Sequence, residues 1–163
     1  MPEFWDAYDR DFNKIENVTL VRGEPIPDGL YHLVCDIVVN HTDGTYLLMQ
    51  RDLQKNFGGR WELTAGGSAL IGETPLEGAM RELREETGIA SSDFKELRRV
   101  VNEQRHFVCV VYFCLTDCDK NSVTLQEGET IDYKWVTKEE ILKMPSDTLA
   151  SVRVLEIFKM LEL

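Results

Sequence analysis

The segment that most constrains this chain runs from Gly67 to Ile89 and has the sequence GSALIGETPLEGAMRELREETGI. Its centre carries the signals of one helix. Thr74 can be the N-cap, Pro75 suits the first helical position, and Glu77 can complete a capping box with Thr74. Gly88 is a natural stop just past the last turn. The segment therefore predicts a single helix that begins after Thr74 and ends before Gly88.

Three glutamates share one face of this predicted helix. Glu82, Glu85 and Glu86 lie at positions i, i+3 and i+4, so their carboxylates converge. Each pair of like charges at this spacing costs about 0.2–0.5 kcal/mol, and a hard cation removes that cost. Magnesium prefers carboxylate oxygens and keeps positions open for water and for a substrate phosphate. The spacing predicts a bound Mg²⁺, with Mn²⁺ as an alternative.

The same segment resembles the Nudix box, G-x5-E-x7-R-E-U-x-E-E-x-G-U with U apolar, at every fixed position. The matching residues are Gly67, Glu73, Arg81, Glu82, Leu83, Glu85, Glu86, Gly88 and Ile89. Chance agreement at one start point is roughly one in 10^8 at ordinary residue frequencies. A charge-rich helix face is usually a solvated surface, but the glycines and glutamates at their required distances outweigh that interpretation.

The resemblance implies an α/β fold, the Nudix α/β/α sandwich with a mixed β-sheet. It also implies hydrolysis of a phosphoanhydride bond in a nucleoside diphosphate linked to another group, or in a related substrate. The metal ligands it implies are the carbonyl of Gly66 and the carboxylates of Glu82, Glu85 and Glu86. The structural residues of the box would be Gly67, Glu73, Arg81 and Gly88, with Glu73 and Arg81 fixing the geometry of the loop and helix.

The attacking water needs a carboxylate that accepts its proton. Within the family this falls either to a box glutamate or to a glutamate on a distal loop. We expect Glu127 first, with Glu129 close behind, both in the polar loop of residues 126–130. Glu82 is the fallback base. The alternative is that the two loop glutamates are only solvated turn residues.

Two cations precede the glycine-rich segment. Arg51 and Lys55 could contact substrate phosphates, although lone cations are more often surface residues. Several aromatic side chains could stack on a base, but aromatic residues in strands usually belong to the core; these are Trp61, His106, Phe107 and Tyr112.

The remaining segments alternate β-branched, apolar runs with turn signals. Strands are predicted over Tyr31–His41, Tyr46–Gln50, Trp61–Thr64, Phe94–Asn102, His106–Leu115 and Ile131–Val136. Residues 65–67 are expected to form a glycine-rich loop. A second helix should follow Thr137, with Glu140 completing its capping box, and a third, capped by Asp147, should run to the C-terminus.

Length and charge limit the organisation and the partners. The 163 residues suit one domain, residues 1–163, in which the resemblance covers roughly residues 30–145 and the first ~30 residues are an extension. The net charge of −11 disfavours nucleic acid as a partner. No apolar run approaches the ~18 residues of a membrane-spanning helix, and the first residues lack a signal-peptide pattern. We expect a cytoplasmic enzyme whose substrate is a small phosphorylated molecule.

Two other functions are compatible with this fold. The segments Phe4–Asp9 and Arg22–His32 resemble proteins grouped with isopentenyl-diphosphate isomerase, which needs a proton-transferring cysteine and a following histidine before the helix. Gly66 and Ser68 stand at those positions. A Nudix module that binds a nucleotide without turnover would typically lose box carboxylates, and all are present here. Both alternatives are therefore disfavoured.

The substrate itself is left open by the sequence. The signatures of ADP-ribose pyrophosphatases, NADH pyrophosphatases and dinucleoside polyphosphate hydrolases are all absent downstream of the box. A homodimer could form through the amphipathic residues 149–163, but core packing explains that pattern equally well. The four cysteines are expected to be buried thiols and not a zinc site.

Overall fold

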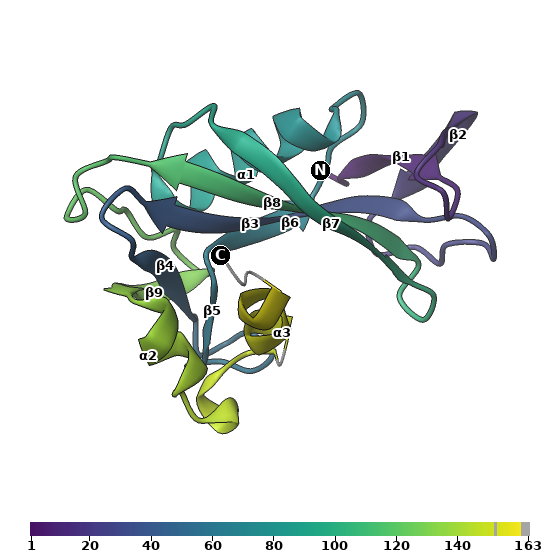
Figure 1. The fold of residues 1–163 in the computed structure, drawn as a ribbon. Coiled ribbons are helices and arrows are strands. Elements are labelled where there is room, and N and C mark those ends of the chain that lie inside the picture. The colour runs from purple at the N-terminus through teal and green to yellow at the C-terminus, as the bar shows by residue number, and fades with distance from the viewer. Residues whose placement is uncertain (152, 161–163) are drawn as a thin grey trace.

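The computed structural model describes residues 1–151 and 153–160 and is built around one mixed sheet (Figure 1). The strands of this sheet follow the order β5 (Trp61–Leu63), β4 (Tyr46–Arg51), β3 (His32–His41), β8 (Phe107–Thr116) and β7 (Phe94–Asn102). Two more strands join it: β6 (Ala65–Ser68) pairs with β3, and β9 (Thr130–Val136) pairs with β4. Strands β3 and β8 are parallel and the other pairs are antiparallel. All strands predicted from residue 31 to residue 136 are present, with their ends within one residue.

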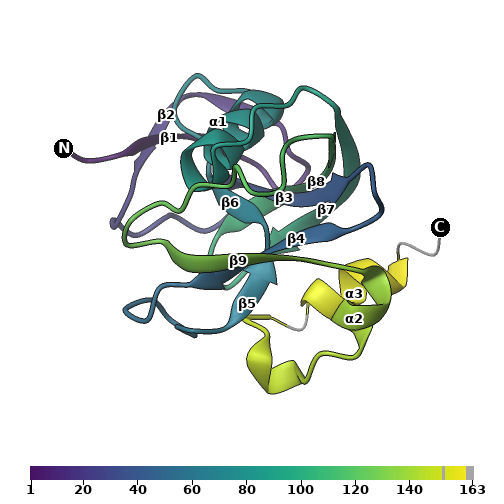
Figure 2. The same cartoon turned by 90° about the vertical axis from the view of Figure 1, so that its left-hand side faces the viewer.

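Helices cover both faces of this sheet. Helix α1 (Pro75–Thr87) lies on one side, and α2 (Lys138–Leu142) and α3 (Arg153–Met160) lie on the other (Figures 1 and 2). The predicted α/β/α sandwich with a mixed sheet is confirmed. In the part of the chain that the structure describes, no helix is both long enough and apolar enough to span a membrane.

The alternation of side chains along β3 creates two cores. Leu33 and Ile37 are buried with Leu83 of α1 in the first core. Val38 is buried with Phe158 of α3 in the second. Each such side chain contributes about 1.5–3 kcal/mol when fully buried, so both helices are held to the sheet by apolar packing.

The first 30 residues contain a β-hairpin that the sequence analysis did not predict. Strands β1 (Phe4–Tyr8) and β2 (Lys14–Val21) form a separate two-stranded sheet. Trp5 and Leu20 are buried in a small core of their own. The hairpin joins the domain where the backbone N–H groups of Tyr8 and Tyr31 each donate to the other's carbonyl, at 2.8 and 2.9 Å. The extension therefore packs directly against the start of β3.

The predicted caps of the first two helices are confirmed. The Thr74 hydroxyl accepts from the Glu77 backbone N–H, and the Glu77 carboxylate accepts from the Thr74 N–H, both at 3.2 Å. Gly88 has a φ of 78°, the left-handed conformation that glycine adopts without strain. Thr137 and Glu140 form the same capping box at the start of α2.

Two local predictions are wrong. Residues 65–67 are not a loop but part of β6, because their backbone pairs with residues 35–37 of β3. Asp147 does not cap a helix; it lies inside a single 3-10 turn, Ser146–Thr148. Leu149 is then fully buried and extended, and Ala150 donates to the Trp61 carbonyl at 2.8 Å, so no helix continues from Asp147, and α3 is described from Arg153 to Met160. The end predicted for this helix, residues 161–163, lies outside the described residues.

Candidate active site

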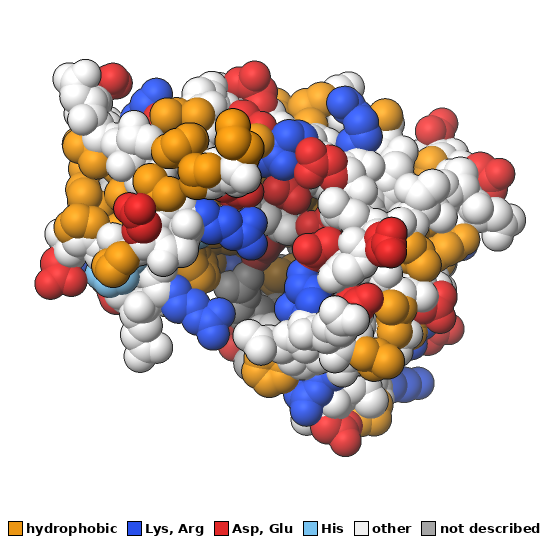
Figure 3. Space-filling view, turned by 180° about the vertical axis from the view of Figure 1, so that it is seen from behind, with side chains coloured by type: hydrophobic (Ala, Val, Ile, Leu, Met, Phe, Trp, Pro, Cys, Tyr) orange, Lys and Arg blue, Asp and Glu red, His pale blue; other side chains and the backbone are white. Residues whose placement is uncertain are grey.

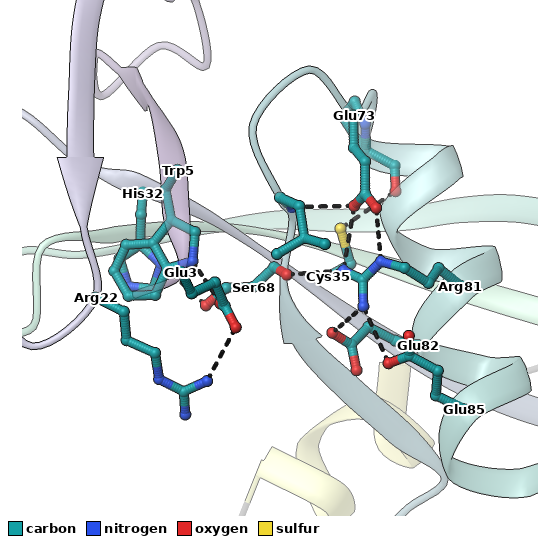
Figure 4. A network of polar contacts seen from close by, with 12 residues as sticks. Glu3, Trp5, Arg22, His32, Cys35, Ser68, Glu73, Arg81, Glu82 and Glu85 are labelled. Atoms are coloured by element: carbon teal, nitrogen blue, oxygen red, sulfur yellow. Dashed lines mark hydrogen bonds and ion pairs between the residues drawn. The ribbon is translucent and has the colours of Figure 1, made fainter. Parts of the chain in front are cut away.

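Arg81 is the centre of the contacts that hold the box together (Figure 4). Its Nε lies 2.6 Å from Glu73 Oε1, and its Nη2 donates to the Ser68 carbonyl at 3.1 Å. On the helix itself, Nη1 lies 2.9 Å from Glu82 Oε1 and 3.1 Å from Glu85 Oε2. The guanidinium thus connects the loop before α1 to the two glutamates that follow it.

Arg81 keeps its proton in this environment. Burial lowers its pKa, but the hydrogen bond to Glu73 and the charges of Glu82 and Glu73 outweigh burial and raise the pKa above its ordinary value. Burial also raises the pKa of Glu82, and Arg81 opposes that rise. Arg81 therefore stays charged and can hold its ion pairs with Glu73 and Glu82.

Both glycines of β6 make room for carboxylates. A Cβ on Gly67 would lie 2.5 Å from the carboxyl carbon of Glu82, and a Cβ on Gly66 would lie 2.5 Å from Asp36 Oδ1. Real Cβ atoms essentially never come this close to another atom. At both positions glycine therefore leaves room for an acidic side chain that packs against the strand.

A cleft of about 690 Å³ lies beside β6 and the end of α1. Figure 3 shows it as a hollow with acidic and basic side chains around its mouth. Gly66 and Gly67 form part of its wall. Its other lining residues include the acids Asp36, Glu62, Glu86 and Glu129, the cations Arg51, Lys55 and Arg105, and the apolar Phe57, Phe107, Val154 and Ile157.

Glu86 is the buried carboxyl of this cleft, with 8% of its surface exposed. Burial raises the pKa of Glu86 to about 9, the charges of Glu82, Glu62 and Glu129 act in the same direction, and Lys55 opposes them. A carboxyl in such surroundings ionises at neutral pH only when a cation lies beside it. Its environment thus suits a group that binds a cation.

A half-buried acid of the cleft is Glu62, whose pKa is raised by burial and lowered by its partner Arg51. Arg51 Nη1 lies 2.7 Å from Glu62 Oε2. Lys55 is paired in the same way with Glu129. Both predicted substrate-binding cations therefore line the cleft, and each is held by a carboxylate.

The predicted metal ligands are near one another but not gathered around one point. Gly66 and Glu86 line the cleft, whereas Glu82 and Glu85 pair with Arg81. Among the described residues, no three acidic, histidine or cysteine side chains form a ready metal cage. The oxygen donors suit Mg²⁺, and the Glu85 side chain is 48% exposed. Exposed ion pairs are worth about 0–1 kcal/mol, so Glu85 can leave Arg81 at little cost.

The two distal glutamates differ in position. Glu129 lines the cleft beside Lys55, but Glu127 is exposed and is not among the residues that line it. Of the two, Glu129 is therefore the glutamate that lies at the cleft. The turn at Gly128, which has a φ of 82°, separates the two side chains.

Several cleft residues were not predicted. Asp36 interrupts an apolar strand, which is a signal that sequence analysis could have used. Glu62 and Arg105 carried no such signal, because only the folded sheet brings them to the cleft. Phe107, expected in the core, is partly exposed to the cleft. All four cysteines are free thiols; three are buried and Cys118 is partly exposed.

The family model and the sequence relatives that this chain matches all belong to the same family. The chain matches the model of the NUDIX domain over residues 30–156. It is 31% identical over 140 residues to a Nudix hydrolase of Listeria monocytogenes, which covers 85% of this chain and 82% of that protein. It is 37% identical over 114 residues to the Nudix hydrolase YfcD of Escherichia coli K12, covering 69% of this chain and 62% of YfcD.

Solved structures share the fold. DR0079 of Deinococcus radiodurans superposes with a TM-score of 0.76 at 18% identity, covering 98% of this chain and 100% of that one. The NUDIX domain of Shewanella oneidensis NrtR, complexed with ADP ribose, gives a TM-score of 0.63 at 24% identity, covering 80% and 85%. With the family match over most of its length and the complete box around Arg81, this chain belongs to the Nudix hydrolase family, whose members hydrolyse acid anhydrides in phosphorus-containing substrates.

Proposed function

We propose that this protein is a Mg²⁺-dependent hydrolase that cleaves the phosphoanhydride bond of a nucleoside diphosphate linked to a second group, or of a related substrate. One observation carries the proposal: the buried carboxyl of Glu86 lines the cleft with Gly66. On the same helix, Glu82 lies one turn before Glu86, and Glu85 immediately precedes it. These oxygen donors match the preference of a hard divalent cation.

The metal would be held by the carboxylates of Glu82, Glu85 and Glu86 and by the carbonyl of Gly66. A bound Mg²⁺ or Mn²⁺ polarises phosphoryl oxygens and neutralises the leaving phosphate. Arg81 and Glu73 fix the backbone on which these ligands stand. Gly67 leaves room for the Glu82 carboxylate beside β6, and Gly88 ends the helix in the left-handed conformation.

The proposed substrate is a small phosphorylated molecule with an organic group. The cleft volume of about 690 Å³ is within the range of about 300–1,000 Å³ that small-molecule sites occupy. Arg51, Lys55 and Arg105 supply positive charge for phosphates. Phe107 and the apolar residues of α3 supply a surface for the organic group. The ADP ribose bound to the NrtR NUDIX domain supports a nucleotide-like substrate.

For the general base, the geometry favours Glu129 over Glu127. Glu129 is at the cleft, and its pairing with Lys55 holds its carboxylate there. Glu82 is the fallback, but its ion pair with Arg81 and its expected contact with the metal leave it less available. The base must lie within hydrogen-bond reach of the attacking water.

The isomerase alternative has little support from the site. Gly66 offers no thiol, and the Ser68 hydroxyl is bonded to His32 Nδ1 at 3.2 Å. Cys35 is buried, and burial raises its pKa to about 12. The organisation as one domain, the cytoplasmic location and a homodimer through residues 149–163 stay predictions.

The deciding experiment is a panel of nucleotides and nucleotide sugars incubated with the protein and Mg²⁺, with released phosphate or pyrophosphate measured. We expect turnover of at least one member, its loss with a chelator and its return with Mg²⁺ or Mn²⁺. Tight binding of a panel member without any turnover would favour the non-catalytic nucleotide-binding module instead. Deuterium exchange into isopentenyl diphosphate would favour the isomerase.

A further inference from the structure

The N-terminal hairpin is hydrogen-bonded to the loop that precedes helix α1. The backbone N–H of Gly72 donates to Asp6 Oδ2 at 2.8 Å, and the N–H of Ile71 donates to the Phe4 carbonyl at 3.0 Å. Phe4 and Asp6 belong to β1, which lies before residue 30, where the family match begins. Two consecutive N–H groups of the box loop are thus satisfied by residues outside the shared domain.

Asp6 is built into this contact. It is 8% exposed, and within residues 1–151 and 153–160 its ion pair is with Lys14 of β2, at 3.5 Å. A buried carboxylate is costly unless hydrogen bonds and a cation compensate it. Asp6 also stands at the irregularity of the β1–β2 pairing, between Asp6 and Ala7. These features indicate a side chain that is placed for the Gly72 N–H.

A second connection runs through β3 (Figure 4). The Trp5 ring stacks on His32 with centroids 4.0 Å apart and planes 13° apart. His32 Nδ1 is bonded to the Ser68 hydroxyl at 3.2 Å, and the Ser68 carbonyl accepts from Arg81. Both connections from the hairpin therefore end at the contacts of Arg81.

The loop that Asp6 holds leads directly to those contacts. Gly72 is followed by Glu73, whose two carboxylate oxygens bond Arg81 at 2.6 and 3.1 Å. Arg81 in turn bonds Glu82 and Glu85. A displacement of residues 71–73 would move the Glu73 carboxylate and with it the Arg81 guanidinium. The positions of Glu82 and Glu85, which bond that guanidinium, would then change as well.

We propose that Asp6 is a positioning residue for the metal-binding glutamates, acting through Gly72, Glu73 and Arg81. The proposal rests on the function proposed above for Glu82 and Glu85. It gives the hairpin a role in catalysis beyond the stability of the fold. The hydrogen bond to Gly72 is the contact that matters, because it fixes the loop next to Glu73.

The test compares Asp6→Leu and Asp6→Asn with Leu20→Ala. Leucine has a similar size and suits a buried position but cannot accept from Gly72, whereas the asparagine carbonyl oxygen can. Leu20 is buried in the hairpin core and is not bonded to the box loop, so Leu20→Ala is the control for hairpin stability alone. For each variant, Tm, kcat, KM, the Mg²⁺ concentration for half-maximal rate and the Mn²⁺ affinity by calorimetry are measured well below Tm.

We expect Asp6→Leu to lower kcat and to weaken Mn²⁺ binding by about tenfold, the lower end for residues that orient metal ligands, with KM unchanged. Asp6→Asn should restore most of both quantities, and Leu20→Ala should lower only Tm. Folded Asp6→Leu with wild-type kcat and metal affinity would overturn the proposal. If the wild-type protein shows no turnover, the proposed function fails separately, and the Mn²⁺ affinities then decide the role of Asp6.

Discussion

The carboxylate of Glu82 lies directly against the backbone of Gly67, so closely that a Cβ there would be 2.5 Å from its carboxyl carbon. Gly67 has no positive φ, so its requirement comes from space and not from backbone strain. The glycine therefore determines where one proposed metal ligand can stand. The predictions below begin from this contact.

Gly67→Ala should push Glu82 away from β6 and weaken metal binding. We expect a loss of about tenfold or more in Mg²⁺ affinity and in kcat, measured by Mg²⁺ titration of the rate. The control is the double variant Gly67→Ala/Glu82→Asp compared with Glu82→Asp alone, because the shorter acid frees the space that the methyl group needs. If Gly67→Ala costs as much in the Glu82→Asp background as in the wild type, the close contact is not the cause.

Glu86→Gln and Glu85→Gln should each lower kcat by about 100-fold or more, since each replaces a charged carboxylate ligand of the proposed metal by a neutral amide and so weakens the stabilisation of the transition state by the metal. The two should differ in stability. Glu86 is buried and Glu85 is exposed, so only Glu86→Gln should change Tm without metal. Arg84→Gln, exposed on the same helix, is the matched control for both measurements. A Glu86→Gln variant with near-normal turnover would contradict the site.

The general base is tested by changing Glu129, Glu127 and Glu82 separately to Gln. We expect Glu129→Gln to lower kcat at least tenfold, which corresponds to about 1.4 kcal/mol of barrier, while Mg²⁺ affinity is kept. Glu127→Gln should be neutral, because that side chain is exposed outside the cleft. Glu82→Gln should lose both kcat and metal affinity. Unchanged kcat in Glu129→Gln would leave the base to the box.

The stability of the protein should fall in mild acid because of His32. Burial lowers the pKa of His32 to about 4; Glu3 raises it and Arg22 lowers it further. An unfolded histidine has a pKa of about 6.5. Between that pH and about pH 4, His32 is therefore protonated in the unfolded chain and neutral in the folded protein. This contribution is complete above about pH 6.5 and is lost as the pH falls toward 4.

His32→Phe keeps a ring for Trp5 to stack on but cannot titrate. Urea unfolding between pH 4.5 and pH 8 should therefore show a smaller loss of unfolding free energy in acid for the variant than for the wild type. The carboxylates and the other histidines are common to both proteins, so the difference isolates His32. Parallel curves would show that His32 titrates alike in both states.

The parts of this fold that were predictable depend on neighbours in sequence. Thr74, Glu77 and Gly88 cap α1 with atoms that lie within a few residues of one another, so spacing alone predicts them. The strand at Gly66 was not predictable, because its partner is Asp36, 30 residues earlier. Glu62 and Arg105 could not be predicted for the same reason. Glu62 reaches the cleft through the pairing of β5 in the sheet, and Arg105 reaches it from the turn between β7 and β8.

The hairpin was missed for a different reason. Strand β2 is mostly exposed, so it lacks the apolar alternation that marks a half-buried strand. The turn between β1 and β2 contains no Asp-Gly or Asn-Gly signal. It is instead held by Asp9, which accepts from the N–H groups of Asp11 and Asn13 at 2.8 and 3.0 Å.

Among the cations of the cleft, Arg105 should contribute to substrate binding without also stabilising the fold through an ion pair. Arg51 and Lys55 are already paired with Glu62 and Glu129, but the described residues place no carboxylate within ion-pair distance of Arg105. It is exposed on the turn between β7 and β8, two residues before Phe107. An anionic group of the substrate can therefore bind it without first displacing an acid.

Arg105→Ala should raise KM about tenfold, as expected for the loss of one charge-assisted hydrogen bond worth about 1.5–3 kcal/mol, and should leave kcat and Tm near wild type. Arg105→Lys should recover part of the affinity. Arg51→Ala should behave differently, because it leaves the half-buried Glu62 without its paired cation and so lowers Tm as well as activity. Steady-state kinetics and thermal unfolding of the three variants separate these outcomes. A fall in kcat with constant KM for Arg105→Ala would instead mean that this cation acts on the transition state.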